Sequence, residues 1–369
     1  NNPNIVLAGG SEGLHKTVNG GNTWTTITST RIYDLKFKTD DPSVVFSLRH
    51  NSTDNVTDFY RSVNTGDNWT KINTGWTEPN ASTQNSGGRM TVSDNFSGII
   101  YTFTGAKYTH LSDTKNGIKI RKSEDAGLTW QLMVDSDQVF KGKLRSGTTK
   151  INNGQGYYDW DIEMLDSDPN VVMLGTQSKW LTDNGFSNDS LLTWGTDVGG
   201  HADLQEALFN GDDLWIASDG GIVKSHAGVV GYDIKMNGIN AAEFWSFDQG
   251  WNRDAQVGTL YHNGTIGRTD SYDEGIFRFF GGAEPEFSAL KHPYPDKIIS
   301  KGYGSVNGRS LPDNFEDEES TFSYNIQPNS YYALWLTNEE SEIEVSPFNY
   351  NIHWVGQDSM LHKSLDFGV

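Results

Sequence analysis

The stretch Ser123-Glu124-Asp125-Ala126-Gly127-Leu128-Thr129-Trp130 decides how the rest of this chain is interpreted. It has the form Ser-x-Asp-x-Gly-x-Thr-Trp. A short Asp or Asn side chain can bond the backbone just ahead of it, and Gly accepts the positive φ of a tight turn. The hydroxyl residue is expected to end one strand, and Trp to open the next as a large buried anchor. The stretch therefore predicts a hairpin connection, which we call a clip.

The clip recurs along the chain. Near copies stand at residues 17–24 and 62–69, and a decayed copy begins at Thr182, with Thr193-Trp194 displaced by an insertion. The last copy starts at Ser364 and stops before its Trp. A basic residue usually precedes the Ser or Thr, and these marks are about 41 to about 61 residues apart, close to the period of a four-stranded propeller blade. The repeat therefore predicts a radial array of blades.

The segments between clips give the strand order of one blade. Residues 33–37 and 161–165 alternate apolar and polar side chains, as half-buried strands do. Asp41-Pro42 and Asp168-Pro169 follow them, and Pro marks a corner because it cannot continue a central strand. Each blade is thus expected to run inner strand A, Pro turn, strand B, strand C, clip and outer strand D.

We therefore predict an all-β fold, a β-propeller of four-stranded antiparallel blades with clips between strands C and D. Seven blades are expected, and eight is the alternative. The chain starts at a B strand and ends just after a C strand, so we expect one propeller domain over residues 1–369 that forms part of a longer polypeptide.

Composition excludes several classes of function. The formal net charge of -20 would repel a phosphate backbone, so nucleic acid is not an expected partner. The apolar runs are far shorter than the roughly 20 residues that cross a bilayer, so no membrane insertion is expected. The chain has no Cys and therefore no disulfide framework. An acidic loop at residues 313–319 could bind a structural calcium ion or could simply be solvated.

The clips resemble the Asp-box, or bacterial neuraminidase (BNR), repeats of sialidases, xyloglucan-degrading hydrolases and sortilin-type propellers. Further stretches, such as Gly156-Tyr157-Tyr158-Asp159-Trp160 and Ser218-Asp219-Gly220-Gly221, resemble repeat-bearing secreted bacterial proteins called glycosyl hydrolases. The resemblance implies a propeller fold, and Asp boxes also occur in proteins that catalyse nothing. The sialidase Phe/Tyr-Arg-Ile-Pro motif is absent. Gln205 stands where the resemblance implies a second histidine, so no metal site is predicted.

Blade geometry indicates where a site would lie. Strand A is innermost, so residues that enter the A strands should converge at one end of the channel, while the clips lie at the opposite end. The converging residues supply carboxylates, aromatic faces and a cation, which a polysaccharide site needs. The expected catalytic residues are Asp159, Asp203, His201 and Tyr158. The expected substrate-binding residues are Arg89, Trp160, Trp245 and Tyr157.

Each candidate also has a structural interpretation. Tyr158 and Trp160 could plug the channel or pack between blades, Asp159 could cap a turn, and His201 could be a hydrogen-bonded turn residue. Arg89 could pair with a neighbouring carboxylate, and Asp219 before two glycines is typical of a turn.

The main hypothesis is a secreted or cell-surface propeller that hydrolyses or eliminates within a polysaccharide at the channel mouth, without a cofactor. The alternative is a non-catalytic module of a larger surface or secreted protein. Such a module would bind a glycan, a protein or other domains of the same polypeptide. A purely structural spacer is a third interpretation.

Overall fold

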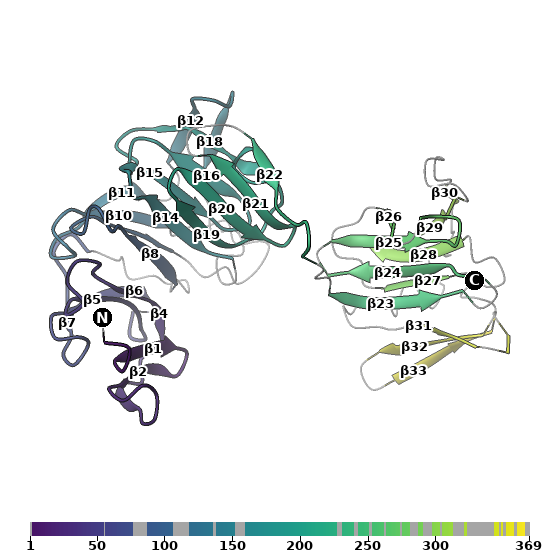
Figure 1. Ribbon diagram of the computed structural model, residues 1–369, viewed down its shortest axis with the longest axis horizontal. Coiled ribbons are helices and arrows are strands. Elements are labelled where there is room, and N and C mark those ends of the chain that lie inside the picture. The colour runs from purple at the N-terminus through teal and green to yellow at the C-terminus, as the bar shows by residue number, and fades with distance from the viewer. Residues whose placement is uncertain are drawn as a thin grey trace. The chain divides into compact units, whose positions relative to one another are not determined.

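The computed structural model of the chain is built from β-strands, and no α-helix occurs in the part that is described (Figure 1). The described residues are 2–54, 56–76, 87–105, 118–135, 138–151, 159–226, 231–239, 243–250, 253–261, 263–273, 275–280, 287–290, 297–302, 305–312, 321–322, 343–346, 348–349, 352–357 and 360–365. The chain divides into two compact units, residues 1–237 and 238–369, and each is described by itself.

The first unit contains a series of antiparallel sheets in which strands consecutive in the sequence are neighbours. The first sheet has three strands, β1 (Val6–Gly10), β2 (Gly13–Thr17) and β3 (Thr25–Thr28). The second has four, β4 (Ile32–Phe37), β5 (Val45–Asn51), β6 (Val56–Ser62) and β7 (Thr70–Lys71). The third has four, β8 (Gly88–Val92), β9 (Ile100–Thr104), β10 (Lys119–Ser123) and β11 (Gln131–Asp135).

Two further four-stranded sheets complete this series. One contains β14 (Asp161–Leu165), β15 (Asp168–Gly175), β16 (Lys179–Thr182) and β18 (Thr193–Trp194), which leads into a short 3-10 helix (Gly195–Val198). The other contains β19 (Leu204–Asn210), β20 (Asp213–Ser218), β21 (Gly221–His226) and β22 (Tyr232–Ile234). The predicted order of strands A, B, C and D is confirmed in each of these sheets.

An additional small sheet is formed by connecting segments of the first unit. It contains β12 (Val139–Gly142), β13 (Thr148–Lys150) and β17 (Ser190–Leu191), and β17 pairs with β12 in parallel. The β17 strand belongs to the insertion that separates the decayed clip from its Trp. Because β16 still pairs with β18, at Trp180 opposite Trp194, the insertion leaves the order of the four main strands intact.

The second unit follows the same plan. One sheet contains β23 (Phe244–Gln249), β24 (Gln256–Leu260), β25 (Gly264–Arg268) and β26 (Arg278–Phe279). The next contains β27 (Phe287–Leu290), β28 (Lys297–Gly302), β29 (Ser305–Ser310) and β30 (Thr321–Phe322). The last has three strands, β31 (Ile343–Val345), β32 (His353–Gln357) and β33 (Met360–Ser364).

Inner strands of successive sheets contact one another, as the blade model requires. In the first unit β4 contacts β8, β8 contacts β14, and β14 contacts β19. In the second unit β27 contacts β23 and β31. The chain therefore has an all-β fold of propeller-blade sheets, in which strand A is the inner strand. The count of seven blades stays a prediction.

The hydrophobic core fills the spaces between neighbouring sheets. Phe46 and Phe59 of the second sheet pack with Met90 and Ile100 of the third, and all are fully or almost fully buried. Each such side chain contributes about 1.5–3 kcal/mol through burial. The residues that form the largest such layer, between the third sheet and the sheet that begins with β14, include Phe103, Ile120, Ile162, Met164, Leu174 and Trp180. Sheet-on-sheet burial is thus the main source of stability.

The clip at residues 123–130 has the predicted hydrogen bonds. The Ser123 hydroxyl donates to Asp125 (2.8 Å) and accepts the Gly127 amide (2.9 Å). The Asp125 carboxylate accepts the amides of Leu128 and Thr129 and the Thr129 hydroxyl. The same pattern recurs in the first copy, where Asn19 Oδ1 accepts the Thr23 amide, and in the second, where Asn64 Oδ1 accepts the Asn68 amide, each at 2.9 Å.

Four clips are also tied to the beginning of strand B in their own sheets. The tie is a backbone bond from a clip residue to the carbonyl of a residue at or just before the start of that strand. The four bonds run from Gly20 to Asn4 (3.0 Å), Thr65 to Ser43 (2.7 Å), Ala126 to Gly98 (2.8 Å) and Gly185 to Asn170 (2.8 Å). All four donors have positive φ, near 60°, which turns their N–H groups toward the A–B turn. The clips and the A–B turns therefore share one end of the blades, and strand A enters from the other.

The clips also contact the preceding sheet. Lys16, the basic residue before the first clip, pairs with Asp67 of the second clip at 2.7 Å. Arg61, before the second clip, donates through Nε to the Ala126 carbonyl of the third at 3.0 Å. Gly127 lies so close to Phe59 that a Cβ atom there would be 2.8 Å from the ring. The basic residues noted in the sequence thus join neighbouring sheets.

The expectation that every clip Trp is buried is wrong. Trp130 is 6% exposed, because its ring packs against Phe59 of β6 and against Trp76, which follows β7, with centroids 4.6 Å and 5.0 Å away. Trp24 is 46% exposed, and its indole donates to the Gly21 carbonyl of its own clip at 3.1 Å. A clip Trp is buried only where the preceding sheet supplies partners.

Replacing Asp125 tests the clip. Asp125→Ala is expected to lower the free energy of unfolding by about 1–2 kcal/mol, because four hydrogen-bond donors lose their acceptor. Asp125→Asn is expected to cost clearly less, since Asn19 and Asn64 make the main bonds in other copies. Urea denaturation measures both. Equal losses for the two variants would contradict the assigned role of the side-chain oxygen.

Candidate functional site

A polar cluster lies where strands β14 and β19 begin, at the end of the blades opposite the clips. Gln205 Nε2 donates to Asp159 Oδ1 at 2.9 Å and to Asp219 Oδ1 at 3.0 Å. Lys179 Nζ donates to the His201 backbone carbonyl. Asp203 also belongs to the cluster, because its carboxyl group is hydrogen-bonded to that of Asp159. Two of the expected catalytic carboxyls, Asp159 and Asp203, are thus brought together.

Backbone turns position these groups. Asp203 has a φ of +60°, which is unusual for a residue with a side chain. Its amide donates to the Gln177 carbonyl at 3.1 Å, and the next amide, of Leu204, donates to the Thr176 carbonyl at 2.9 Å. The B–C turn that carries Asp219 lies beside them, because the Asp219 amide approaches the Asp203 carbonyl at 3.4 Å. Asp203 is therefore held by the turn between β15 and β16, and Asp219 lies on the turn between β20 and β21 of the adjacent sheet.

Electrostatics in the cluster favour shared protons. Asp159 is 0% exposed, and burial, with the nearby Asp203 and Asp219 carboxylates, raises its pKa to about 7. Burial lowers the pKa of Lys179 to about 8, although the three carboxylates act in the opposite direction. The Asp159 and Asp203 carboxyls can be hydrogen-bonded because one of them keeps a proton.

The bridging amide sets the distance between Asp159 and Asp219. Both oxygens accept from one nitrogen, so they lie no more than about 6 Å apart. Carboxyl groups about 5–5.5 Å apart are typical of retaining glycosidases. The Asp159 and Asp203 carboxyls, in direct contact, are closer than any pair that flanks a glycosidic bond. Asp219, which the sequence indicated as a turn residue, is therefore the better partner for Asp159.

A second group of carboxyls lines the inner strands themselves. Burial raises the pKa of Asp161 to about 6, and its Oδ2 accepts the Ala207 amide at 2.7 Å. Burial and the neighbouring Asp161 raise the pKa of Glu163 to about 7, and its Oε2 accepts the Thr91 hydroxyl at 2.9 Å. Sequence reasoning placed both on an A strand but assigned them no role. The sequence signal for an inner-strand position was the alternation of these two acidic residues with Ile162, which is buried.

The other predicted residues lie in different surroundings. The His201 side chain is exposed, with Nδ1 3.2 Å from the Ala202 carbonyl, and only its backbone joins the cluster. Arg89 Nη1 donates to the Tyr33 carbonyl at 2.9 Å, so it contacts the preceding inner strand. Trp160 is almost fully buried against Phe103, with ring centroids 4.8 Å apart, and is a core residue.

The three remaining predicted residues lie elsewhere. Trp245 belongs to the second unit, where it stacks on Tyr261 with ring centroids 4.4 Å apart. Tyr157 and Tyr158 lie outside the described residues, as does the acidic loop at 313–319.

Within the described part of the chain, no group of three or more His, Asp or Glu side chains could hold a metal ion. No described helix is long and apolar enough to span a bilayer.

Comparisons with known proteins give distant likenesses. No family model and no curated protein matches the chain. Among solved structures, a GH74 enzyme from Niastella koreensis is 14% identical, with a TM-score of 0.38 over 99% of this chain and 52% of its own. The GH74 xyloglucanase from Xanthomonas campestris is 11% identical, with a TM-score of 0.41 over 98% and 54%. U3-55K is 10% identical, with a TM-score of 0.37 over 90% of each chain. This chain spans about half the length of the two GH74 proteins, and these likenesses carry no argument about activity.

The raised pKa of Asp159 predicts a specific pH dependence. The folded protein holds a proton that the unfolded chain releases near pH 3.8, so this group destabilises the fold as pH rises toward about 7. Asp159→Asn removes the effect. The stability of the variant relative to the parent should increase between pH 4 and pH 7, by on the order of 2–4 kcal/mol, and then level off.

Urea denaturation at several pH values measures this difference. Asp213→Asn is the control, because Asp213 lies at the clip end of the same sheet as Gln205 and Asp219, and hydrogen bonds from Lys224 and His226 lower its pKa. The stability of Asp213→Asn relative to the parent should not increase between pH 4 and pH 7. A flat profile for Asp159→Asn would show that Asp159 is ionised throughout.

Proposed function

We propose that the chain is a carbohydrate-active β-propeller that acts on a polysaccharide where strands β14 and β19 begin. The observation that carries the proposal is the bridged pair of carboxyls, Asp159 and Asp219, at a separation of no more than about 6 Å. The pKa of Asp159 is raised to about 7, so it can hold a proton at neutral pH while a neighbouring carboxylate stays ionised.

Cleavage of a glycosidic bond needs this combination. One carboxylic acid protonates the leaving oxygen, and a second carboxylate acts as nucleophile or base. We assign the acid to Asp159, with Asp203 as the group that helps retain its proton, and the second carboxylate to Asp219. Gln205 holds the two apart and orients them. Elimination on a uronate would use the same site with Lys179 as the compensating cation.

The proposal also states the substrate class, the cofactor requirement and the location of the protein. The substrate is a polysaccharide or glycan, the site needs no cofactor, and the protein acts outside the cell or on its surface. A structural calcium ion at residues 313–319 remains a prediction of the sequence. The family relation to Asp-box propellers is likewise an inference from the clips.

One observation favours a second candidate, a non-catalytic module that binds a glycan or a protein. Asp159 is 0% exposed, so a substrate would reach it only after its cover moves. A binding module needs no such access, and its carboxyls would serve to hold the two turns together.

Activity assays on carboxyl variants distinguish the candidates. The full chain is incubated with a panel of neutral and uronate polysaccharides, and reducing ends and unsaturated products are measured. Asp159→Asn and Asp219→Asn should each lower kcat by about 10²- to 10⁴-fold, because each removes one proton-transfer or nucleophilic group. Asp213→Asn should have no effect. Turnover that survives in the double variant would refute the assignment, and saturable binding without turnover would favour the second candidate.

A further inference from the structure

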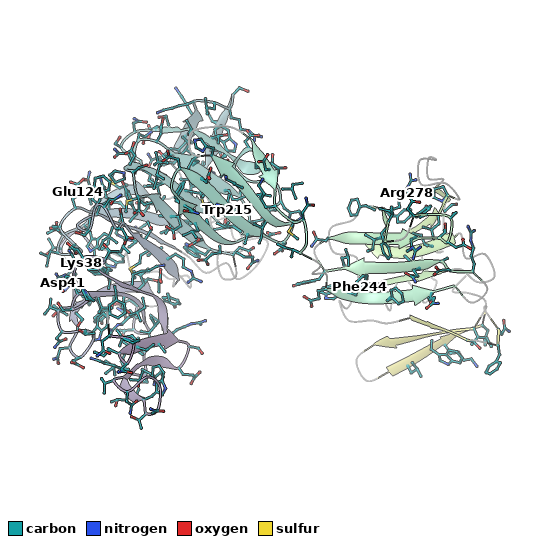
Figure 2. All side chains as sticks on the ribbon, viewed as in Figure 1. Lys38, Asp41, Glu124, Trp215, Phe244 and Arg278 are labelled. Carbon is teal, nitrogen blue, oxygen red and sulfur yellow. The ribbon has the colours of Figure 1, made fainter. Side chains whose placement is uncertain are left out.

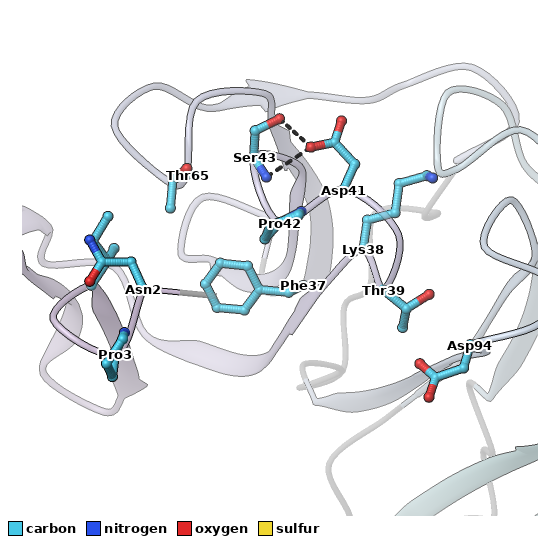
Figure 3. Close-up of a pocket in the computed structure, with 11 residues that line it drawn as sticks. Asn2, Pro3, Phe37, Lys38, Thr39, Asp41, Pro42, Ser43, Thr65 and Asp94 are labelled. Carbon is cyan, nitrogen blue, oxygen red and sulfur yellow. Dashed lines mark hydrogen bonds between the residues drawn. The ribbon is translucent and has the colours of Figure 1, made fainter.

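A pocket of about 820 Å³ opens in the first unit at the clip end of the blades, the end opposite Asp159 and Asp219 (Figure 3). Segments from three successive sheets form it, namely the residues before β1, the A–B turn after β4 and the A–B turn after β8. In Figure 2, Lys38 and Asp41 of the second of these turns lie at the edge of the unit. The residues that line it are Asn2, Pro3, Ile5, Phe37, Lys38, Thr39, Asp41, Pro42, Ser43, Thr65 and Asp94.

Its apolar surface is centred on one aromatic ring. Phe37 is the last residue of β4 and is 36% exposed, and it belongs to none of the core clusters. Figure 3 shows the ring projecting from the strand toward Asn2. Pro3, Ile5 and Pro42 line the same space. An aromatic ring left open in a pocket of this size can stack against a flat apolar ligand face.

Polar groups also line the pocket. Asp41 Oδ1 accepts the Ser43 hydroxyl at 2.6 Å and the Ser43 amide at 3.0 Å, and these bonds lower its pKa, so it stays ionised. Asp94, exposed, brings a second carboxylate from the next turn. Thr65 adds a hydroxyl from the clip.

The charge of the pocket is negative. Lys38 brings a cation, but its Nζ is bound to Asp40 and to the Ser97 hydroxyl. The carboxylates of Asp41 and Asp94 therefore determine which ligands can enter. An anionic ligand would be repelled, whereas a neutral ligand with several O–H donors would find charge-assisted acceptors.

We propose that this pocket binds a neutral pyranose unit of an oligosaccharide. The C–H face of the sugar would stack on Phe37, and its hydroxyls would donate to Asp41 and Asp94. A lysine or arginine side chain of a peptide would need only one carboxylate over the ring, whereas here acceptors come from three separate segments of the pocket lining. The pocket is separate from the Asp159 cluster, and the proposal does not depend on catalysis there.

Binding measurements on the full chain test the proposal. Calorimetric titrations use cellotetraose, mannotetraose and xylotetraose, with trigalacturonate and tetralysine as charged comparisons. At least one neutral oligosaccharide should bind saturably, and trigalacturonate should not. Phe37→Ala should weaken binding about tenfold or more, which corresponds to loss of a stacking contact, and Phe37→Tyr should retain it.

Matched variants locate the site. Trp24→Ala removes an exposed aromatic ring from a clip outside the pocket and should leave binding unchanged. Asp159→Asn should also leave it unchanged, so failure of this proposal and failure of the proposed activity are distinguishable. Asp94→Asn, a change at an exposed position, should weaken binding a few-fold. It replaces Phe37→Ala as the test variant if circular dichroism shows that Phe37→Ala does not fold.

Three results would overturn the proposal. The first is the absence of saturable binding to any of the neutral oligosaccharides. The second is binding that is equal in the parent and in both pocket variants. The third is tight binding of tetralysine in place of the neutral oligosaccharides. The last would identify a pocket for cationic side chains.

Discussion

The bond between a clip and the beginning of strand B in the same sheet is the constraint on which the blades of the first unit depend. In four successive sheets a residue with positive φ, such as Thr65 or Ala126, donates its amide to a turn carbonyl. In the first three clips the Asp or Asn holds that conformation by accepting amides ahead of it, whereas Asn184 of the fourth donates through Nδ2 to the Ser190 carbonyl. The backbone bonds hold the end of strand C beside the beginning of strand B, and so fix the register of the two strands. Burial between sheets then follows, because side chains of neighbouring sheets can pack closely when their strands are held in place.

Much of the fold could be predicted because its signals are local. The clip, its glycine and the Pro corner lie within a few residues of one another, so Ser123, Asp125 and Gly127 show the hairpin directly. The fate of the clip Trp could not be predicted in the same way. It depends on Phe59 of β6 and on Trp76 after β7, and both are distant in sequence from Trp130.

The candidate site shows the same limit. The sequence indicated which end of the blades to inspect and named Asp159 and Asp203, because residues that enter inner strands must converge. It could not show that Gln205 bridges Asp159 and Asp219, since that contact joins turns of two sheets across 46 and 14 positions. A residue noted only as a departure from a family pattern thus connects two carboxyls. The exposed ring of Phe37 was equally hidden, since a strand-ending Phe is usually a core residue.

The insertion between β16 and β18 has a consequence for how such a chain can change. The eight residues between Asn184 and Thr193 include a two-residue strand, β17, that pairs with β12 and leaves the pairing of Trp180 with Trp194 in place. A connection between strands C and D can therefore lengthen while the inner strands stay the same. Its exposed residues 187–189 are a place to graft a foreign peptide or an affinity loop, because new sequence there would be displayed without altering the inner-strand ends that carry Asp159 and Gln205.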